Sequence, residues 1–525
     1  MKEVSKTEAE PINSYLIYFL ISVVLGSLIL LPILWHPIGR DQGHYCYVAW
    51  AWLKYKIPFF RSGNTYEIGI IFLTYLAFKI FGVSTFSLRL FDLIIQILNL
   101  GLIFTLANLL DEQKRNPLAG FISAGFYAFF YLGLGFLATA QRDGFVLPFL
   151  LLASLLFLKI HRGRMNYLGI WGVGILTGIA ILLKPTFALS GVVFSIFYIW
   201  RAVRFKKNIG KILIEQALLL FSGLLPAVIA FIIYHLLGAP LSYWKEAWIY
   251  FSQIYPTAGR GVQDYFQLIK LWDYIIFQLL HKDQMLWLGL FFYFLFSFGS
   301  GQSRDSNLES QLILVAQFII CLISIFLQSK PDYPLQYHKI PALGFAAIFS
   351  GKFFGDLINQ YFEGTSLRKR LSTCLGIAGL LFLQLLSSDI ETLYCILNYY
   401  FRSLNYAYVN TYSGYYKTAE YIKTHTSPDQ YIGATGFSQI LFLSRRLAPT
   451  RYTFDTVMTS KAPGKPLHPY QEKWQEELLE DLKRAQPVYI IWKEDLSKIY
   501  GLKQFVKENY FPEARFGEIT IYHKK

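Results

Sequence analysis

The chain contains long, nearly uninterrupted runs of apolar residues, and this arrangement restricts what it can fold into. A helix needs about 20 apolar residues to cross the roughly 30 Å hydrocarbon core of a bilayer. Runs of this length recur between residues 14 and 396. The composition agrees, because 54% of the 525 residues are hydrophobic and only 16% are charged, which is unusual for a soluble globular protein. The sequence therefore predicts a multi-span α-helical membrane protein.

About eleven helices are expected to cross the membrane. The first apolar block, 14–35, is too long for a cleaved signal segment, and no small-residue cleavage site follows it. A further block, 68–81, is too short to cross and contains Lys79, so an interfacial or re-entrant helix is expected there. The other spans are expected near 87–110, 117–137, 144–160, 167–183, 186–200, 211–237, 284–300, 309–327, 341–357 and 372–396.

The distribution of basic residues predicts the orientation of these spans. Short loops rich in Lys and Arg stay on the cytoplasmic side. With a cytoplasmic N-terminus, the basic clusters at 114–115, 159–164, 201–211 and 368–370 all lie inside. The net charge of +15 is then mostly a topology signal, and it gives no reason to expect a nucleic-acid partner. The C-terminus lies outside in this arrangement.

The chain is expected to form two domains. Residues 1–396 would form a transmembrane catalytic domain, with 36–86 as a first outer loop that carries interfacial helices. Residues 397–525 would form a small outer α/β domain, because short strand-like runs alternate there with helical patterns. The expected strands are 431–434, 488–492 and 518–522, and the expected helices are 415–424, 470–485 and 502–510.

The first outer loop contains a carboxylate next to a predicted helix. Large residues recur at helical spacing from Tyr45 to Tyr55, which predicts an amphipathic helix suited to lying along the membrane surface. Asp41 stands just before this segment. A cap of the helix and a chemical role are both open for Asp41 on spacing alone.

Three other outer segments carry charges close to the ends of spans. Arg142 and Asp143 are adjacent at a turn, Lys184 lies in a Leu-Leu-Lys-Pro turn, and His338 and Lys339 precede Pro341. Each charge alone is compatible with an ion pair or with a side chain that reaches to the interface. Together they put several cations and two carboxylates on one face of the membrane.

These motifs resemble those of the GT-C superfamily of glycosyltransferases. Within it, the chain looks most like the bacterial branch related to protein O-mannosyltransferases and to the aminoarabinose transferase of lipid A. The matching segments are Arg-Asp-Gln-Gly-x-Tyr-x-Tyr from Arg40, Gly-x-Ser-x-x-x-x-Arg from Gly82 to Arg89, Gln-Arg-Asp from Gln141, Leu182 to Pro185, and Tyr337 to Pro341.

The resemblance implies transfer of a sugar from a polyprenyl-phosphate carrier to an acceptor hydroxyl, with inversion of the anomeric centre, on the extracytoplasmic face. The acceptor would be a lipid, a glycan or a protein, and the location would be the inner membrane of a bacterium. Asp41 would be the base, and Asp143 would support it or bind sugar or a metal. Arg142 would be the main phosphate contact, with Lys184, His338 and Lys339 as weaker ones. Further candidate substrate contacts in the outer loops are Arg40, Glu67, Tyr255 and Arg260.

The chain departs from the pattern of this family in two places. Tyr66-Glu67-Ile68 stands where related sequences often have Lys-Pro-Pro, so a phosphate-binding Lys is missing. Gln42 follows Asp41 where many relatives have a second acid, which weakens the case for a metal held by adjacent carboxylates. No cofactor is required by the pattern, and a divalent metal stays open.

Two other classes of function also stay open. Polar residues at span ends, with Gly and Pro inside spans, also suit a transporter or flippase of lipid-linked sugars. The hydropathy pattern shows no internal repeat, and few charged residues fall at the middle of spans, which argues against this class. A non-catalytic protein of envelope assembly is the third alternative.

Overall fold

The computed structural model describes most of the predicted spans and most of the C-terminal domain. The described residues are 12–56, 68–110, 116–162, 167–238, 240–254, 269–270, 284–299, 305–328, 336–362, 376, 379, 413–461 and 466–525. The expected span 372–396, apart from residues 376 and 379, lies outside this set, as do Glu67, Tyr255 and Arg260.

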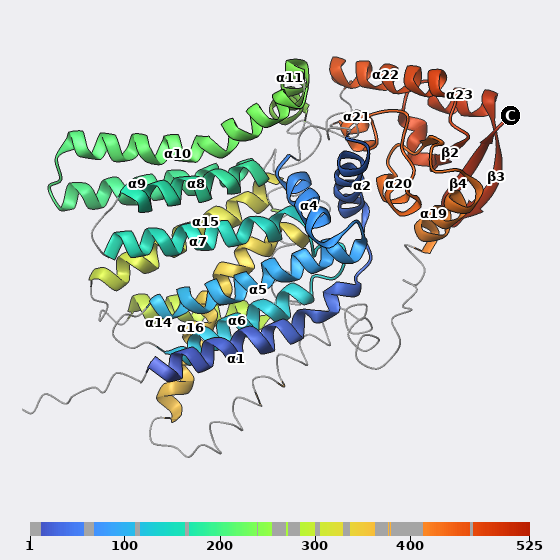
Figure 1. Ribbon diagram of the computed structural model, residues 1–525. Coiled ribbons are helices and arrows are strands. Elements are labelled where there is room, and N and C mark those ends of the chain that lie inside the picture. The colour runs from blue at the N-terminus through green and yellow to red at the C-terminus, as the bar shows by residue number, and fades with distance from the viewer. Residues whose placement is uncertain are drawn as a thin grey trace, which may run out of the picture.

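A bundle of long helices forms the larger part of the fold (Figure 1). Within the described residues, seven helical segments are long and apolar enough to cross a membrane, and four shorter apolar helices accompany them. The mostly helical membrane architecture is therefore confirmed, whereas the total of eleven spans stays a prediction. The bundle helices are α1 (Ile12–Leu30), α5 (Thr85–Leu109), α6 (Pro117–Leu132), α7 (Arg142–Arg162), α8 (Tyr167–Leu183), α9 (Ala188–Arg204), α10 (Ile209–Leu236), α14 (Gln284–Gly299), α15 (Asp305–Gln328) and α16 (Ile340–Phe362).

Helix α5 lies inside the bundle and packs against α1, α4, α6, α7 and α16. It begins at Thr85 because the Ser84 hydroxyl accepts a hydrogen bond from the backbone N–H of Ser87 at 3.0 Å. The preceding Gly82 has a φ of 83°, a left-handed conformation that glycine adopts without strain. Both residues belong to the Gly-x-Ser-x-x-x-x-Arg motif, so the first half of that motif sets where α4 ends and α5 begins.

Helices α2 (Arg40–Tyr55) and α4 (Ile68–Phe81) lie at one end of the bundle (Figure 1). The helix expected over Tyr45 to Tyr55 is present, but its surroundings differ from the prediction. Residues Gln42 to Ala51 are all buried, because α2 packs against α4 on one side and against the C-terminal domain on another. It is therefore an enclosed helix rather than an amphipathic helix with one open face.

The capping interpretation of Asp41 is wrong. Gly39 is the N-cap of α2, and its backbone N–H donates to the Gln42 side chain at 3.1 Å. Asp41 is the second residue of the helix and belongs to its first turn. A carboxylate in a first turn is favoured by the helix dipole, and its side chain is not used as a cap.

The C-terminal elements form a small four-stranded sheet with helices, in orange and red in Figure 1. The strand order is β1-β2-β4-β3, with β1 parallel to β2 and the other pairs antiparallel. The predicted α/β character is confirmed, but β3 and α20 were not predicted. The elements are α19 (Ser413–His425), β1 (Ile432–Gly433), α20 (Ser438–Ser444), α21 (Thr456–Thr459), α22 (Pro469–Ala485), β2 (Tyr489–Trp492), α23 (Leu502–Asn509), β3 (Tyr510–Phe516) and β4 (Ile519–Lys524).

The C-terminal domain docks on α2 and α4 through α20. The rings of Phe78 on α4 and Phe442 on α20 stack with their centroids 5.6 Å apart. The backbone N–H of Ala448 donates to the Tyr47 hydroxyl at 3.0 Å. A second contact involves α11 (Leu241–Ile249), where Arg451 forms an ion pair with Glu246 at 2.9 Å. The helix that carries Asp41 is thus held between the bundle and this domain.

Candidate active site

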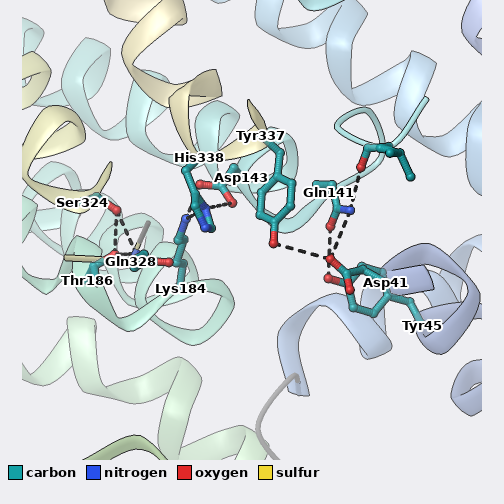
Figure 2. A network of polar contacts seen from close by, with 11 residues as sticks. Asp41, Tyr45, Gln141, Asp143, Lys184, Thr186, Ser324, Gln328, Tyr337 and His338 are labelled. Atoms are coloured by element: carbon teal, nitrogen blue, oxygen red, sulfur yellow. Dashed lines mark hydrogen bonds and ion pairs between the residues drawn. The ribbon is translucent and has the colours of Figure 1, made fainter. Parts of the chain in front are cut away.

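The N-terminal ends of α2 and α7 meet two short 3-10 segments, η3 (Pro185–Phe187) and η5 (Gln336–Lys339), at one end of the bundle. This junction gathers four segments that are far apart in sequence, and most of the predicted charges lie on them. Figure 2 shows two polar groups there: one contains Asp41, Gln141 and Tyr337, and the other contains Asp143, Lys184 and His338.

Asp41 is a half-buried carboxylate with long hydrogen bonds. Its Oδ2 accepts from the Tyr337 hydroxyl at 3.4 Å and from Gln141 Nε2 at 3.5 Å. Within the part of the chain that the structure describes, no residue donates to its Oδ1. Gln141 is itself held, because its amide donates to the Leu137 carbonyl at 2.9 Å and accepts from the Tyr45 hydroxyl at 3.2 Å. Asp41 is therefore oriented by neutral partners and keeps capacity to accept a proton.

Asp143 has the opposite surroundings. Its side chain is 0% exposed and forms an ion pair with Lys184, whose side chain is 2% exposed. Lys184 Nζ lies 3.0 Å from His338 Nδ1, and that nitrogen is 3.5 Å from Asp143 Oδ2. A buried carboxylate needs such compensation, since leaving water is costly for an unpaired charge. Asp143 is thus paired inside the protein, whereas Asp41 is partly exposed.

The dipeptide Tyr337-His338 joins the two groups. Tyr337 contacts Asp41, and the next residue, His338, contacts both Lys184 and Asp143 (Figure 2). The two rings are in edge contact, with centroids 4.4 Å apart. Segment η5 therefore sets the distance between the two carboxylate environments.

The turn that precedes α7 is organised by Gln42. Its side-chain amide N donates to the carbonyls of Phe136, Leu137 and Thr139 at 3.1, 3.0 and 2.9 Å. A carboxylate has no N–H and could not make these bonds. The residue that replaces the second acid of related sequences is therefore a structural donor here. Among the described residues, no group of three or more His, Cys, Asp or Glu side chains is placed to hold a metal ion.

Arg142 is half-buried at the start of α7 and lies close to both groups. Its charge acts on His44 of α2, whose pKa is lowered to about 3 by burial first and then by the charges of Arg40 and Arg142. It also lies within electrostatic range of Lys184 and His338. Lys339, at the end of η5, is half-buried as well. Both cations are therefore partly exposed.

Arg40 is turned toward the C-terminal domain. It forms an ion pair with Asp455, and its guanidinium carbon lies 4.7 Å from the centre of the Phe454 ring. The structure gives Arg40 a role in joining the two parts of the chain, and its expected contact with substrate stays a prediction. The other three expected substrate contacts, Glu67, Tyr255 and Arg260, lie outside the described residues.

Some residues of the junction were not predicted as site residues. Tyr337 and Gln141, the partners of Asp41, stand directly beside the predicted His338 and Arg142 in sequence. A cluster of three polar side chains, Thr186, Ser324 and Gln328, also lies beside Lys184 (Figure 2). Ser324 Oγ is 2.8 Å from Thr186 Oγ1 and accepts a hydrogen bond from Gln328 Nε2 at 2.9 Å. Ser324 and Gln328 stand four positions apart in an apolar span, and this spacing was the sequence signal that could have identified the cluster.

The arrangement suits a displacement by a hydroxyl nucleophile. An accessible carboxylate can accept a hydroxyl proton, and nearby cations can stabilise a leaving group that gains negative charge. Asp41 is the half-buried carboxylate, with Arg142 and Lys339 as the half-buried cations.

The chain is similar to several known proteins. No curated protein sequence matches it, but the family described as dolichyl-phosphate-mannose-protein mannosyltransferase matches residues 68–242. The crystal structure of ArnT from Cupriavidus metallidurans bound to undecaprenyl phosphate has 14% sequence identity and a TM-score of 0.58, and the match covers 98% of each chain. The archaeal oligosaccharyltransferase AglB from Archaeoglobus fulgidus, in complex with an inhibitory peptide and a dolichol-phosphate, has 12% identity and a TM-score of 0.54 over 97% of this chain and 74% of AglB.

The two solved structures agree with this chain in fold over nearly its whole length, and the family match adds sequence similarity from α4 to α11. The resemblance predicted from short motifs is therefore confirmed: the chain has the GT-C membrane fold of these two structures, which are bound to polyprenyl phosphates, and its residues 68–242 match a mannosyltransferase family.

Proposed function

We propose that this chain is an inverting glycosyltransferase that moves a sugar from a polyprenyl-phosphate donor to an acceptor hydroxyl on the extracytoplasmic face. One observation carries the proposal: the half-buried carboxylate of Asp41 and the half-buried cations Arg142 and Lys339 lie on α2, α7 and η5, which adjoin at one end of a GT-C fold. Among the similar structures, ArnT is bound to undecaprenyl phosphate and AglB to a dolichol-phosphate, which supports a lipid phosphate as the donor's carrier.

Asp41 is assigned as the general base. The acceptor oxygen attacks the anomeric carbon, its proton passes to Asp41 Oδ1, and the bond between that carbon and the phosphate oxygen breaks. Tyr337 and Gln141 hold Oδ2 and orient the carboxylate. A positioned base is worth about 10² to 10⁴ in rate. Inversion follows because the acceptor enters opposite the departing phosphate.

Arg142 and Lys339 are assigned to the phosphate. The leaving group is a lipid phosphate that needs no proton, so cations suffice to stabilise it. Arg142 suits this role best, since a planar guanidinium can bind two phosphate oxygens at once. Lys184 already has Asp143 and His338 as partners. We therefore assign Asp143, Lys184 and His338 to the shape and local field of the site rather than to the chemical step.

The orientation and domain limits belong to the same proposal. Eleven spans with a cytoplasmic N-terminus put the junction of α2, α7 and η5 outside, together with a domain from residue 397 onward, and the host membrane would be a bacterial inner membrane. Single cysteines at Lys473, whose side chain is 55% exposed, and at exposed Lys211 would test this. With the natural cysteines replaced, a membrane-impermeant thiol reagent on intact cells should label Lys473→Cys and leave Lys211→Cys unlabelled. The reverse pattern would overturn the orientation.

A donor panel tests the reaction itself. Purified protein would be offered several polyprenyl-phosphate sugars with lipid, glycan and protein acceptors, and release of the free carrier would be followed. Release that depends on an acceptor is the expected result. Movement of an intact lipid-linked sugar across reconstituted vesicles, without release of carrier, would instead favour the transporter alternative.

A further inference from the structure

Helix α5 carries two buried charged residues, Arg89 and Asp92, which the reaction proposed above does not use. Both side chains are 0% exposed, although the helix is one of the apolar segments long enough to cross a membrane. Ionisable residues in such segments are expensive to bury and usually serve a function. Residues at positions i and i+3 lie on the same face of a helix, so the side chains of Arg89 and Asp92 point to the same side of α5.

Arg89 ties together the two loops that lead to the catalytic helices. Its Nε donates to the carbonyl of His36 at 3.1 Å, and Nη2 donates to the carbonyl of Pro37. These two residues precede α2, which carries Asp41.

On the other side, Arg89 donates to the turn before α7, which carries Asp143. Nη2 reaches the carbonyl of Phe136 at 3.1 Å, and Nη1 reaches the carbonyl and the hydroxyl of Thr139 at 3.1 and 2.9 Å. The five bonds match the five N–H groups of a guanidinium. A lysine has only three donors and lacks the fork geometry.

Asp92 holds the other end of the same peptide unit. Its Oδ2 accepts from the backbone N–H of Ala140 at 3.0 Å, whereas Arg89 binds the carbonyl of Thr139. Asp92 is supported by hydrogen bonds from Tyr131 at 2.7 Å and Gln96 at 2.8 Å. The Thr139–Ala140 peptide is thus held at both ends by α5. Gln42 of α2 also donates to its carbonyl at 2.9 Å, and the Tyr131 hydroxyl of α6 also accepts from its N–H at 3.1 Å.

One residue of this peptide, Ala140, has a strained backbone conformation. Ala140 has a φ of 54°, the left-handed region that costs a residue with a Cβ about 1 to 2 kcal/mol. The next residue, Gln141, contacts Asp41. Two residues after Gln141, the side chain of Asp143 contacts Lys184 and His338. The backbone conformation at Ala140 therefore sets the directions in which the side chains of Gln141 and Asp143 point.

We propose that Arg89 and Asp92 are positioning residues that fix the Thr139–Ala140 peptide and thereby set Asp41 and Asp143 in their relative places. The assignment rests on the proposed function for its effect on turnover, but not for its effect on the turn. It also gives a role to the Arg of the Gly-x-Ser-x-x-x-x-Arg motif: the first part of the motif starts α5, and the Arg connects the two site loops.

The first test removes the acceptor at Asp92 without adding a charge. Asp92→Leu should lower kcat by tenfold or more. The donor KM should rise as well, because Arg142, the proposed phosphate contact, lies between Gln141 and Asp143 in the displaced segment. Asp92→Asn keeps an acceptor for the Ala140 N–H and should restore most of kcat. Asn108→Leu, which also removes a buried polar side chain from α5 but far from the turn, is the matched control and should keep wild-type turnover.

The second test uses the backbone itself. Glycine adopts a left-handed conformation without the penalty of alanine, so Ala140→Gly in the Asp92→Leu background should recover about fivefold or more of the lost kcat. If Asp92 only packs α5 against α6 through Tyr131, the glycine would recover nothing, and that result would overturn the proposal.

A structural measurement keeps this inference separate from the proposed function. Hydrogen exchange of the peptide that spans 136–142 should accelerate by tenfold or more in Asp92→Leu and in Arg89→Lys, and should stay near wild type in Asp92→Asn. Should no donor support turnover at all, this measurement still decides the inference. Unchanged exchange in Asp92→Leu and Arg89→Lys would overturn it even in an active transferase.

Discussion

The contact between α2 and the C-terminal domain leaves no room for a side chain at Gly43, so Gly43→Ala should separate them. A Cβ at Gly43 would lie 2.2 Å from the Cβ and 2.6 Å from the Cα of Gln439 on α20. Carbon atoms pack at about 3.5 to 4.0 Å, and a backbone atom cannot swing aside, so α20 would have to move by more than 1 Å.

The cost can be set against the gain in helix propensity. Overpacking costs about 1 to 3 kcal/mol, and the shift would also strain the bonds of His44 to Ser438 at 3.3 Å and of Ala448 to Tyr47 at 3.0 Å, worth about 1 kcal/mol each. Alanine returns about 1 kcal/mol within a helix. The net cost is about 2 to 4 kcal/mol, which raises the undocked fraction about 30- to 1000-fold.

Cys46 on α2 reports the undocked state. It is a free, buried cysteine, and burial raises the pKa of its thiol to about 12, despite the opposing charges of Arg445 and Arg89, so it should react slowly while docked. With the other cysteines replaced, a thiol reagent should modify Cys46 about 30- to 1000-fold faster in Gly43→Ala. In Gly125→Ala, where a Cβ meets nothing within 4 Å, the rate should equal that of wild type. Equal rates in both variants would refute the docking argument.

Three further changes test other parts of the site. Arg142→Lys keeps the charge but loses the guanidinium fork, so we expect kcat/KM to fall by about tenfold or more in the carrier-release assay; full activity would remove Arg142 from the phosphate site. Gln42→Glu would set a carboxylate against three carbonyl oxygens and should destabilise the protein by about 3 kcal/mol in thermal unfolding, whereas an unchanged melting temperature would contradict the role of this amide. His44 contributes stability that is fully present above pH 6.5 and is lost as the pH falls toward about 3, since its folded-state pKa is lowered to about 3; His44→Gln should flatten the acid limb of the stability profile, and an unchanged limb would contradict this.

The architecture of this chain could be predicted from sequence because hydropathy and periodicity are strong signals. Apolar blocks marked the helices of the bundle, and alternating patterns marked most of the C-terminal sheet. Strand β3 was missed because Pro512, Glu513 and Arg515 break the apolar alternation that identifies a strand, and it forms the edge of the sheet beside β4. The enclosure of α2 was missed because its partner, α20, lies about 400 residues away in sequence.

The candidate site was predicted in part. Asp143, Lys184 and His338 were each identified from the end of a different span, and the structure brings them into contact. Their pairing could not be predicted, because it depends on how three helices pack. The contacts of Arg89 and Asp92 with the turn at Ala140 were beyond prediction for a further reason. A left-handed alanine has no sequence signal, and polar residues within a span are compatible with many partners.

The most direct test of the central claim is the turnover of Asp41→Asn. Asparagine keeps the size of the side chain and can still accept from Tyr337 and Gln141, but it cannot take a proton. Asp143→Asn is measured beside it, and Asp356→Asn serves as the control, since Asp356 is 42% exposed and lies on α16 about 24 Å along the helix from η5.

With a saturating polyprenyl-phosphate sugar donor, we expect Asp41→Asn to express and bind donor as the wild type does, with kcat lower by about 10² to 10⁴. Asp143→Asn should lose less of its turnover, and Asp356→Asn should lose none. Sugar transfer by Asp41→Asn at a rate near that of the wild type would contradict the assignment of Asp41 as the base.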